Sequence, residues 1–161
     1  MIARAVPVPR DAQLSRYVAQ EGCYTDCYEV MHPLQTDLPR FITAFYTTWL
    51  FRLERSVLAA LLRHRITDAQ VAALADGSTQ FAAWEVEARD QGQILLRDIS
   101  DQTRSWLAVA PKEGGVTRLL FGSALLARNG RLPPLARVSI PAHRVYAKAL
   151  LRLAERKLRR G

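Results

Sequence analysis

The chain has 161 residues, 49% of them apolar, and this length is typical of one domain that buries its own core without a disulfide or a metal. It carries 23 lysines and arginines against 15 aspartates and glutamates, and the net charge of +8 allows attraction to phosphates or anionic membranes. No run of about 18 apolar residues is present, which argues against a transmembrane helix. The opening MIARAVPVPRDAQ lacks the apolar core of a signal peptide, so we expect a soluble, cytoplasmic protein.

The first elements are a lead-in and a strand. Residues 1–16 contain two prolines and no periodic apolar pattern, so we expect a loosely ordered lead-in. From Tyr24 to Met31 aromatic and polar residues alternate, which predicts a strand. Pro33 ends it, because proline has no N–H to donate to a neighbouring strand.

The longest periodic segment runs from residue 37 to about residue 64 and predicts one amphipathic helix. Thr36 or Asp37 is suited to cap it, and Pro39 fits its first turn. Its apolar residues recur at spacings of three and four: Phe41, Ile42, Phe45, Trp49, Leu53, Val57 and Leu61. Thr67 and Gln70 predict the capping box of a second, shorter helix, which ends at Gly77.

Beyond residue 80 the period changes to two, which predicts strands at 81–89, 93–99, 103–110 and 116–126. Short turns join these strands, so they form an antiparallel meander. A loop with Asn129-Gly130 and Pro133-Pro134 follows. We expect the terminal helix to begin at Pro141 and to extend to about residue 159. Its predicted inward residues are Val145, Ala149, Leu153 and Leu158.

This order of elements predicts an α+β fold in which a curved antiparallel sheet wraps around the long C-terminal helix, with two helices inserted after the first strand. An amphipathic helix must bury its apolar stripe, and a one-sided antiparallel sheet offers the matching surface. The pattern predicts five strands. A sixth or seventh strand would lie in 131–140 or before Cys23. We expect a single domain over residues 1–161.

Several stretches resemble the helix-grip superfamily, which includes START lipid-transfer domains, polyketide cyclases and the birch-pollen-allergen group. The matching stretches span most of the chain and are Tyr24-Thr-Asp-Cys-Tyr28, Phe41 to Leu62, Phe81-Ala-Ala-Trp84, Ser105-Trp106-Leu107, Leu119-Leu-Phe-Gly-Ser123 and Pro141-Ala-His-Arg-Val-Tyr146. More closely, the chain is similar to a bacterial branch of unassigned activity. The resemblance implies six or seven strands and a hydrophobic pocket for an apolar or amphiphilic ligand. It implies no cofactor, and no catalytic residue carries over by motif.

The cysteines of GCYTDCYEV invite a metal or disulfide interpretation, which strand geometry opposes. Cys23 and Cys27 are four residues apart, about 13 Å along a strand, whereas a disulfide needs Cα atoms about 4.4–6.8 Å apart. His32, His64 and His143 show no ligand spacing to them. We expect two structural thiols and no metal site.

The other face of the first strand carries Tyr24, Asp26, Tyr28 and Val30, which we expect to point inward. A carboxylate in an apolar interior is costly unless it is paired. One interpretation places Asp26 near the strand's end, bonded to backbone or an arginine. The alternative makes it a polar anchor in a pocket, with Arg97 or Arg104 as its partner.

Aromatic residues near the middles of three strands are either core or the lining of a cavity. These are Trp84, Trp106 and Phe121, and Ser123 shares the face of Phe121. A serine hydrolase is not expected, since FGSAL lacks the G-x-S-x-G elbow. His143 and Tyr146 are three residues apart on one face of the terminal helix. A surface or capping role is expected for His143, whose charged form the helix dipole would disfavour.

Three functional hypotheses follow. The first is a domain that holds a hydrophobic or amphiphilic small molecule between sheet and terminal helix. Its candidate ligand-binding residues are Asp26, Tyr28, Trp84, Arg97, Arg104, Trp106, Phe121, Ser123 and Tyr146. The second is a cyclase or hydratase that uses Asp26 or His143 for proton transfer. The third is a protein-interaction module that uses the apolar long helix. We expect a monomer or homodimer, and no nucleic-acid partner, because the basic C-terminal tail lacks any nucleic-acid-binding signature.

Overall fold

The computed structural model describes residues 2–53, 67–127 and 129–161. The described residues form one seven-stranded antiparallel sheet in the order β1-β2-β7-β6-β5-β4-β3. The strands are β1 (Arg4–Ala5), β2 (Tyr24–His32), β3 (Gln80–Phe81), β4 (Trp84–Arg89), β5 (Gln93–Asp98), β6 (Thr103–Pro111) and β7 (Thr117–Leu125). The helices are α1 (Leu38–Tyr46), α3 (Asp68–Ala75) and α4 (Pro134–Leu158), with short 3-10 turns η1 (Gln13–Tyr17) and η2 (Glu113–Gly115).

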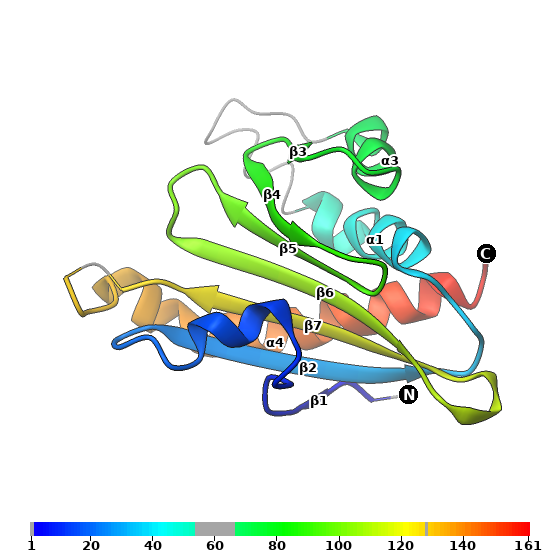
Figure 1. Cartoon of the computed structure of the whole chain (residues 1–161), viewed down its shortest axis with the longest axis horizontal. Coiled ribbons are helices and arrows are strands. Elements are labelled where there is room, and N and C mark those ends of the chain that lie inside the picture. The colour runs from blue at the N-terminus through cyan, green and yellow to red at the C-terminus, as the bar shows by residue number, and fades with distance from the viewer. Residues whose placement is uncertain (1, 54–66, 128) are drawn as a thin grey trace.

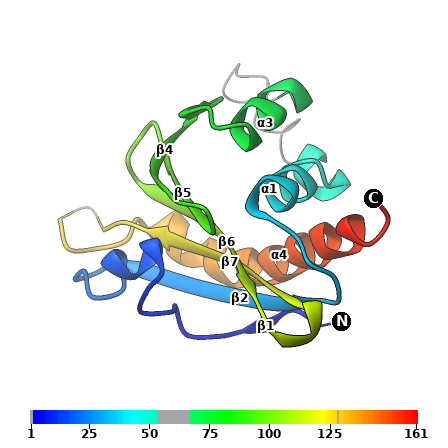
Figure 2. The ribbon, with the colours of Figure 1, turned by 45° about the vertical axis from the view of Figure 1, so that its right-hand side comes forward.

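The sheet curves around α4, and α1 and α3 cover its other end (Figures 1 and 2). The main core fills the concave face between sheet and helices, with contributions from Val30, Phe41, Phe121 and Leu150. This is the helix-grip arrangement, and the predicted fold class is confirmed. Of the two sources considered for extra strands, the N-terminal stretch supplies β1, while residues 134–140 are helical. A further strand appears because the predicted strand 81–89 is divided into β3 and β4 at Ala82, whose φ is 54°.

The N-terminal segment differs from the loosely ordered lead-in expected for it. Its strand β1 pairs with β2, and η1 packs on the convex face of the sheet, opposite α4 (Figure 1). Leu14 and Tyr17 are buried there against Cys27, Leu95 and Trp106. The sequence pattern missed this because only a few apolar side chains anchor the segment, and they follow no single period.

The long helix predicted from residue 37 is interrupted. Asp37 caps α1 by accepting a hydrogen bond from the Arg40 N–H at 2.9 Å, but α1 ends at Tyr46. The Thr48 hydroxyl donates to the Phe45 carbonyl and accepts from the Phe51 N–H, so it caps a new helical segment over residues 49–53. Trp49 and Leu53, predicted on the apolar face, are exposed. The remainder of the predicted helix, at 54–64, lies outside the described residues.

The second helix has the predicted capping box, whereas the terminal helix begins earlier than predicted. Thr67 and Gln70 form the predicted capping box of α3. The terminal helix α4 begins at Pro134 rather than Pro141, because Pro134 occupies the first turn, where no N–H is needed. Pro141 lies inside the helix. The buried positions described for α4 are Ala147, Leu150, Leu151, Ala154, Glu155 and Leu158. Of the predicted inward residues Leu158 is correct, Ala149 and Leu153 are half-buried, and Val145 is wrong at 72% exposed.

Candidate functional site

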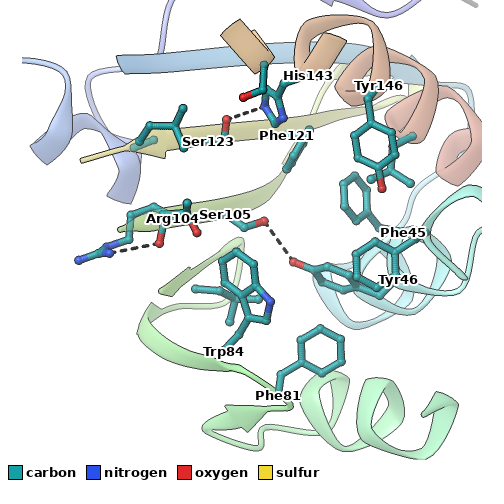
Figure 3. Close-up of a pocket in the computed structure, with 17 residues that line it drawn as sticks. Phe45, Tyr46, Phe81, Trp84, Arg104, Ser105, Phe121, Ser123, His143 and Tyr146 are labelled. Carbon is teal, nitrogen blue, oxygen red and sulfur yellow. Dashed lines mark hydrogen bonds between the residues drawn. The ribbon is translucent and has the colours of Figure 1, made fainter. Parts of the chain in front are cut away.

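A pocket of about 290 Å³ lies between the concave face of the sheet, α1 and α4 (Figure 3). Its apolar lining comes from α1, from the helical segment 49–53, from β3, β4, β5 and β7, and from α4: Phe45, Tyr46, Phe51, Phe81, Trp84, Leu96, Phe121, Ala124, Leu125, Tyr146 and Leu150. Its polar lining consists of Thr103, Arg104, Ser105, Ser123, Ser139 and His143. The pocket therefore combines an apolar body with a few polar groups.

Aromatic rings in mutual contact fix the apolar side of the pocket. The rings of Phe45 and Phe121 lie 4.8 Å apart, centroid to centroid. Tyr46 contacts Phe51 at 5.0 Å and Phe81 at 4.9 Å. The Tyr46 hydroxyl also lies 3.3 Å from the Ser105 hydroxyl. Rings held in such contacts keep their rotamers, so this wall is preorganised.

Ser123 and His143 lie at the opposite side of the pocket from Phe81 and Trp84 (Figure 3), and they form a polar cluster with Asp26. Asp26 on β2 is directly opposite Ser123 on β7 in the strand register. The Ser123 hydroxyl donates to Asp26 Oδ1 at 2.6 Å, and the Ser123 N–H donates to the same oxygen at 3.2 Å. His143 Nε2 from α4 lies 2.9 Å from Ser123 Oγ and 3.4 Å from Asp26 Oδ2.

These contacts determine where the protons are. An ionised carboxylate only accepts hydrogen bonds, so the Ser123 hydroxyl hydrogen points to Asp26. Ser123 Oγ then accepts from His143, and this places a hydrogen on His143 Nε2. Ser123 is therefore a hydrogen-bonded bridge between Asp26 and His143. It is not arranged as a nucleophile, because its hydrogen is directed to a carboxylate rather than to a free base nitrogen.

Asp26 is held in its ionised form. Burial by itself would raise the pKa of this carboxyl group, but hydrogen bonds from His143, Ser123 and Tyr24 and the charge of His143 outweigh it and lower the pKa. The hydroxyls of Tyr24 and Tyr28 each donate to Asp26 Oδ2 at 3.0 Å. Burial, together with the charge of Asp26, raises the pKa of both tyrosines, so they remain donors.

Two cations from α4 lie on the tyrosines that donate to Asp26. The Arg144 guanidinium lies 5.6 Å from the centroid of the Tyr24 ring, and its Nε donates to the Tyr24 hydroxyl at 3.0 Å. Lys148 Nζ lies 5.7 Å from the centroid of the Tyr28 ring. Each cation therefore makes a cation–π contact with a tyrosine whose hydroxyl donates to Asp26.

The predicted ligand-binding residues divide into those that line the pocket and those behind its wall. Trp84, Arg104, Phe121, Ser123 and Tyr146 line it. Asp26 and Tyr28 do not line it, and lie behind Ser123 and His143. The face of β2 that carries Asp26 and Tyr28 points inward, and Asp26 accepts hydrogen bonds from Ser123 and two tyrosines on that side of the sheet.

The prediction that Arg97 or Arg104 pairs with Asp26 is wrong. Arg97 is 47% exposed and pairs with Glu85 at 2.8 Å. The Arg104 guanidinium points away from the pocket (Figure 3). On the convex side it pairs with Glu87 and Asp101 and donates to the Tyr17 hydroxyl. The actual partner, His143, comes from α4.

The prediction that Trp106 lines the cavity together with Trp84 and Phe121 is also wrong. In the register of β6 with β7, Trp106 is opposite Gly122, and Leu107 is opposite Phe121. Residues opposite each other share a face, so Trp106 lies on the convex face. It is buried there beside Leu14, and its Nε1–H donates to Gln93 at 2.9 Å.

His143 has a different role from the surface or capping role expected for it. Because α4 begins at Pro134, His143 lies well past the first turn, where the effect of the helix dipole is largest. Phe45, Tyr46, Ser105 and Ser139 were not predicted as pocket residues. Phe45 could have been found, since it lies on the apolar stripe of the predicted helix, but no local signal marks the two serines.

The cysteines take no part in this site. Cys23 and Cys27 are both free thiols. Burial raises the pKa of Cys27 to about 12, so this thiol is inert at neutral pH. In the part of the chain that the structure describes, no group of three histidine, cysteine, aspartate or glutamate residues is placed to hold a metal ion. The same part contains no helix that is both long and apolar enough to span a bilayer.

Comparison with known proteins yields a distant structural match. A crystal structure of Ara h 8.0201 superimposes on 87% of this chain and 100% of its own, with a TM-score of 0.42 and 10% sequence identity. A similarity of this degree says nothing about ligand or activity. No protein-family model matches the chain, and no curated protein matches it either.

Proposed function

We propose that the protein binds a small apolar or amphiphilic molecule in the pocket between its sheet and α4. The observation that carries this proposal is the composition of the pocket wall, in which aromatic and aliphatic side chains predominate and a few polar groups converge on one side. Ligand sites in proteins have this character. The ligand would gain affinity from apolar burial, about 25 cal/mol per Å² before the costs of association.

The size of the pocket limits the ligand. A volume of about 290 Å³, at the ~30 Å³ that a water molecule occupies in the liquid, corresponds to roughly ten non-hydrogen atoms. A neutral probe of this size with an aromatic body is 3-phenylpropan-1-ol. Its ring matches the aromatic wall formed by Phe45, Phe121 and Trp84.

A titration followed by NMR tests this proposal. We expect 3-phenylpropan-1-ol to shift the signals of pocket residues such as Phe121 and Trp84. Ser139→Trp places a large side chain at the pocket and is expected to weaken binding about tenfold or more, because the apolar surface of the probe is then left in water. Ala142→Trp is the matched control, because Ala142 is exposed on α4 and does not line the pocket.

Two outcomes would contradict the proposal. One is the absence of any shift of pocket signals at millimolar probe. The other is equal weakening by both tryptophan variants. Native mass spectrometry of freshly purified protein adds an independent measurement, since a bound molecule would appear as a mass increment that Ser139→Trp removes.

Proton transfer is a second candidate function, favoured by the position of His143 in the pocket wall with Asp26 and Ser123 behind it. A histidine fixed in this way can move a proton to or from a bound carbonyl compound. The test is exchange of the α-hydrogens of 4-phenylbutan-2-one for deuterium in heavy water. Exchange no faster than in buffer, or equally fast with His143→Gln, would count against this function.

We likewise propose a cytoplasmic protein, monomeric or homodimeric, from the bacterial helix-grip branch that its sequence resembles.

A further inference from the structure

We propose that the ligand of this pocket is a small organic acid whose carboxylate binds at His143. This inference rests on the proposed function and specifies the polar end of the ligand. Three observations support it: the charges of the lining residues, the hydrogen bonds already made within the polar cluster, and the cations near that cluster.

The first argument is the absence of negative charge on the wall. The described residues that line the pocket include no aspartate or glutamate. The lining residues among them that can carry a positive charge are Arg104 and His143, and the Arg104 guanidinium points away from the pocket (Figure 3). An ammonium ligand would therefore lose its hydration without meeting a carboxylate, which is costly. A carboxylate ligand meets the imidazole of His143.

The second argument is that Asp26 and Ser123 already make hydrogen bonds to each other and to neighbouring residues. Asp26 accepts from Tyr24, Tyr28 and Ser123. The Ser123 hydrogen is directed to Asp26, so Ser123 has no hydrogen to donate to a ligand. His143 Nε2 donates to Ser123, which leaves Nδ1 as the second ring nitrogen. When the ring is protonated, both nitrogens donate. Nε2 is then matched by the Asp26–Ser123 pair, and Nδ1 is matched by the carboxylate of the ligand.

The third argument is the local charge balance. Arg144 and Lys148 lie on the tyrosines that donate to Asp26. Two cations therefore offset one carboxylate before any charge on His143 is counted. The chain as a whole carries a net charge of +8. An anion approaching this side of the pocket is attracted, and a cation is repelled.

The experiment compares three probes that differ mainly in their polar end: 3-phenylpropanoate, 3-phenylpropan-1-ol and 3-phenylpropylamine. Each is titrated into the 161-residue chain at pH 6, and dissociation constants are taken from the NMR shifts of pocket residues. We expect the acid to bind about tenfold tighter than the alcohol, because hydrogen bonds to a charged acceptor are stronger than those to a neutral one. We expect the amine to bind more weakly than the alcohol.

Two variants test whether His143 causes the preference for the acid over the alcohol. His143→Gln is expected to bind the acid about tenfold more weakly and to lose the preference for the acid over the alcohol. Arg152→Gln also removes a positive side chain from α4, but at an exposed position away from the pocket, and it should leave both constants unchanged within about twofold. The comparison of probes on the wild-type protein needs no variant, so it stands even if His143→Gln does not fold.

The outcomes separate this inference from the proposed function. Equal binding of acid and alcohol, or an acid preference that persists in His143→Gln, refutes the assignment of the carboxylate to His143 and leaves ligand binding intact. Tighter binding of the amine than of the acid refutes the charge argument. Failure of all three probes to shift pocket signals refutes the proposed function together with this inference.

Discussion

Replacement of Asp26 by asparagine is the sharpest test of the polar cluster. Asparagine keeps the shape of the side chain but exchanges one acceptor oxygen for an amide donor. Oδ1 accepts from the N–H and hydroxyl of Ser123, and Oδ2 accepts from the hydroxyls of Tyr24 and Tyr28. Whichever way the amide is oriented, two of these donors face an NH₂ group.

The cost follows from the number of hydrogen bonds lost. Each lost bond in a buried site costs about 1 kcal/mol, and bonds to a charged acceptor about 1.5–3 kcal/mol. The hydroxyls can rotate to accept from the amide, which recovers part of this. We therefore expect Asp26→Asn to lower the free energy of unfolding by roughly 2–4 kcal/mol at neutral pH.

The stability difference between the wild type and Asp26→Asn depends on pH in a direction that the pKa of Asp26 sets. The pKa of Asp26 is lowered in the folded protein, so its contribution to stability is complete above the unfolded value of about 3.9. The contribution is lost as the pH falls through the folded pKa. The difference between the wild type and Asp26→Asn should therefore be largest near neutral pH and should shrink below about pH 4. Other carboxylates titrate in both proteins and cancel in the difference.

Urea unfolding from pH 7 down to pH 3, followed by circular dichroism, measures this difference. Glu85→Gln is the matched control, because Glu85 is 42% exposed and pairs with the exposed Arg97, so its loss should cost less than about 1 kcal/mol. A variant as stable as the wild type at neutral pH would refute the reasoning. A difference that stays constant down to pH 3 would refute it as well, because it would show that the charge is not involved.

Two further predictions concern the convex face. Iodoacetamide at pH 8 should label Cys23 and leave Cys27 unmodified in peptide mass spectra, because burial raises the pKa of Cys27 to about 12; equal labelling would contradict its burial. Gly122→Ala should lower the free energy of unfolding by about 1–3 kcal/mol, because its Cβ would lie 2.6 Å from Leu14 Cδ2 and 2.9 Å from the Asp26 carbonyl oxygen. An unchanged melting temperature would show that η1 does not pack as described.

The sequence was sufficient for the elements whose signals are local. Asp37 and the pair Thr67 and Gln70 cap their helices through hydrogen bonds that span three residues, so the pattern that predicts them is also the physical cause. The four strands after residue 80 follow from a period of two and from their short turns. The helix-grip fold follows from the order of these elements. The break at Thr48 was missed because a threonine hydroxyl can either extend or cap a helix, and the apolar spacing continues across it.

The site itself required the tertiary structure. Asp26 and Ser123 are 97 residues apart, and they meet because β2 pairs with β7, which no local pattern specifies. His143 joins them only because α4 begins at Pro134 and turns that side chain toward the sheet. Trp106 was assigned to the wrong face because the alternation of a strand shows which residues share a face, but not which face is concave. The sequence by itself indicated that Asp26, on the face of its strand expected to point inward, needs hydrogen-bonding or charged partners, since a buried carboxylate without partners is unstable. Only the pairing of β2 with β7 and the packing of α4 against them decided that its partners include Ser123 and His143, at the wall of a pocket.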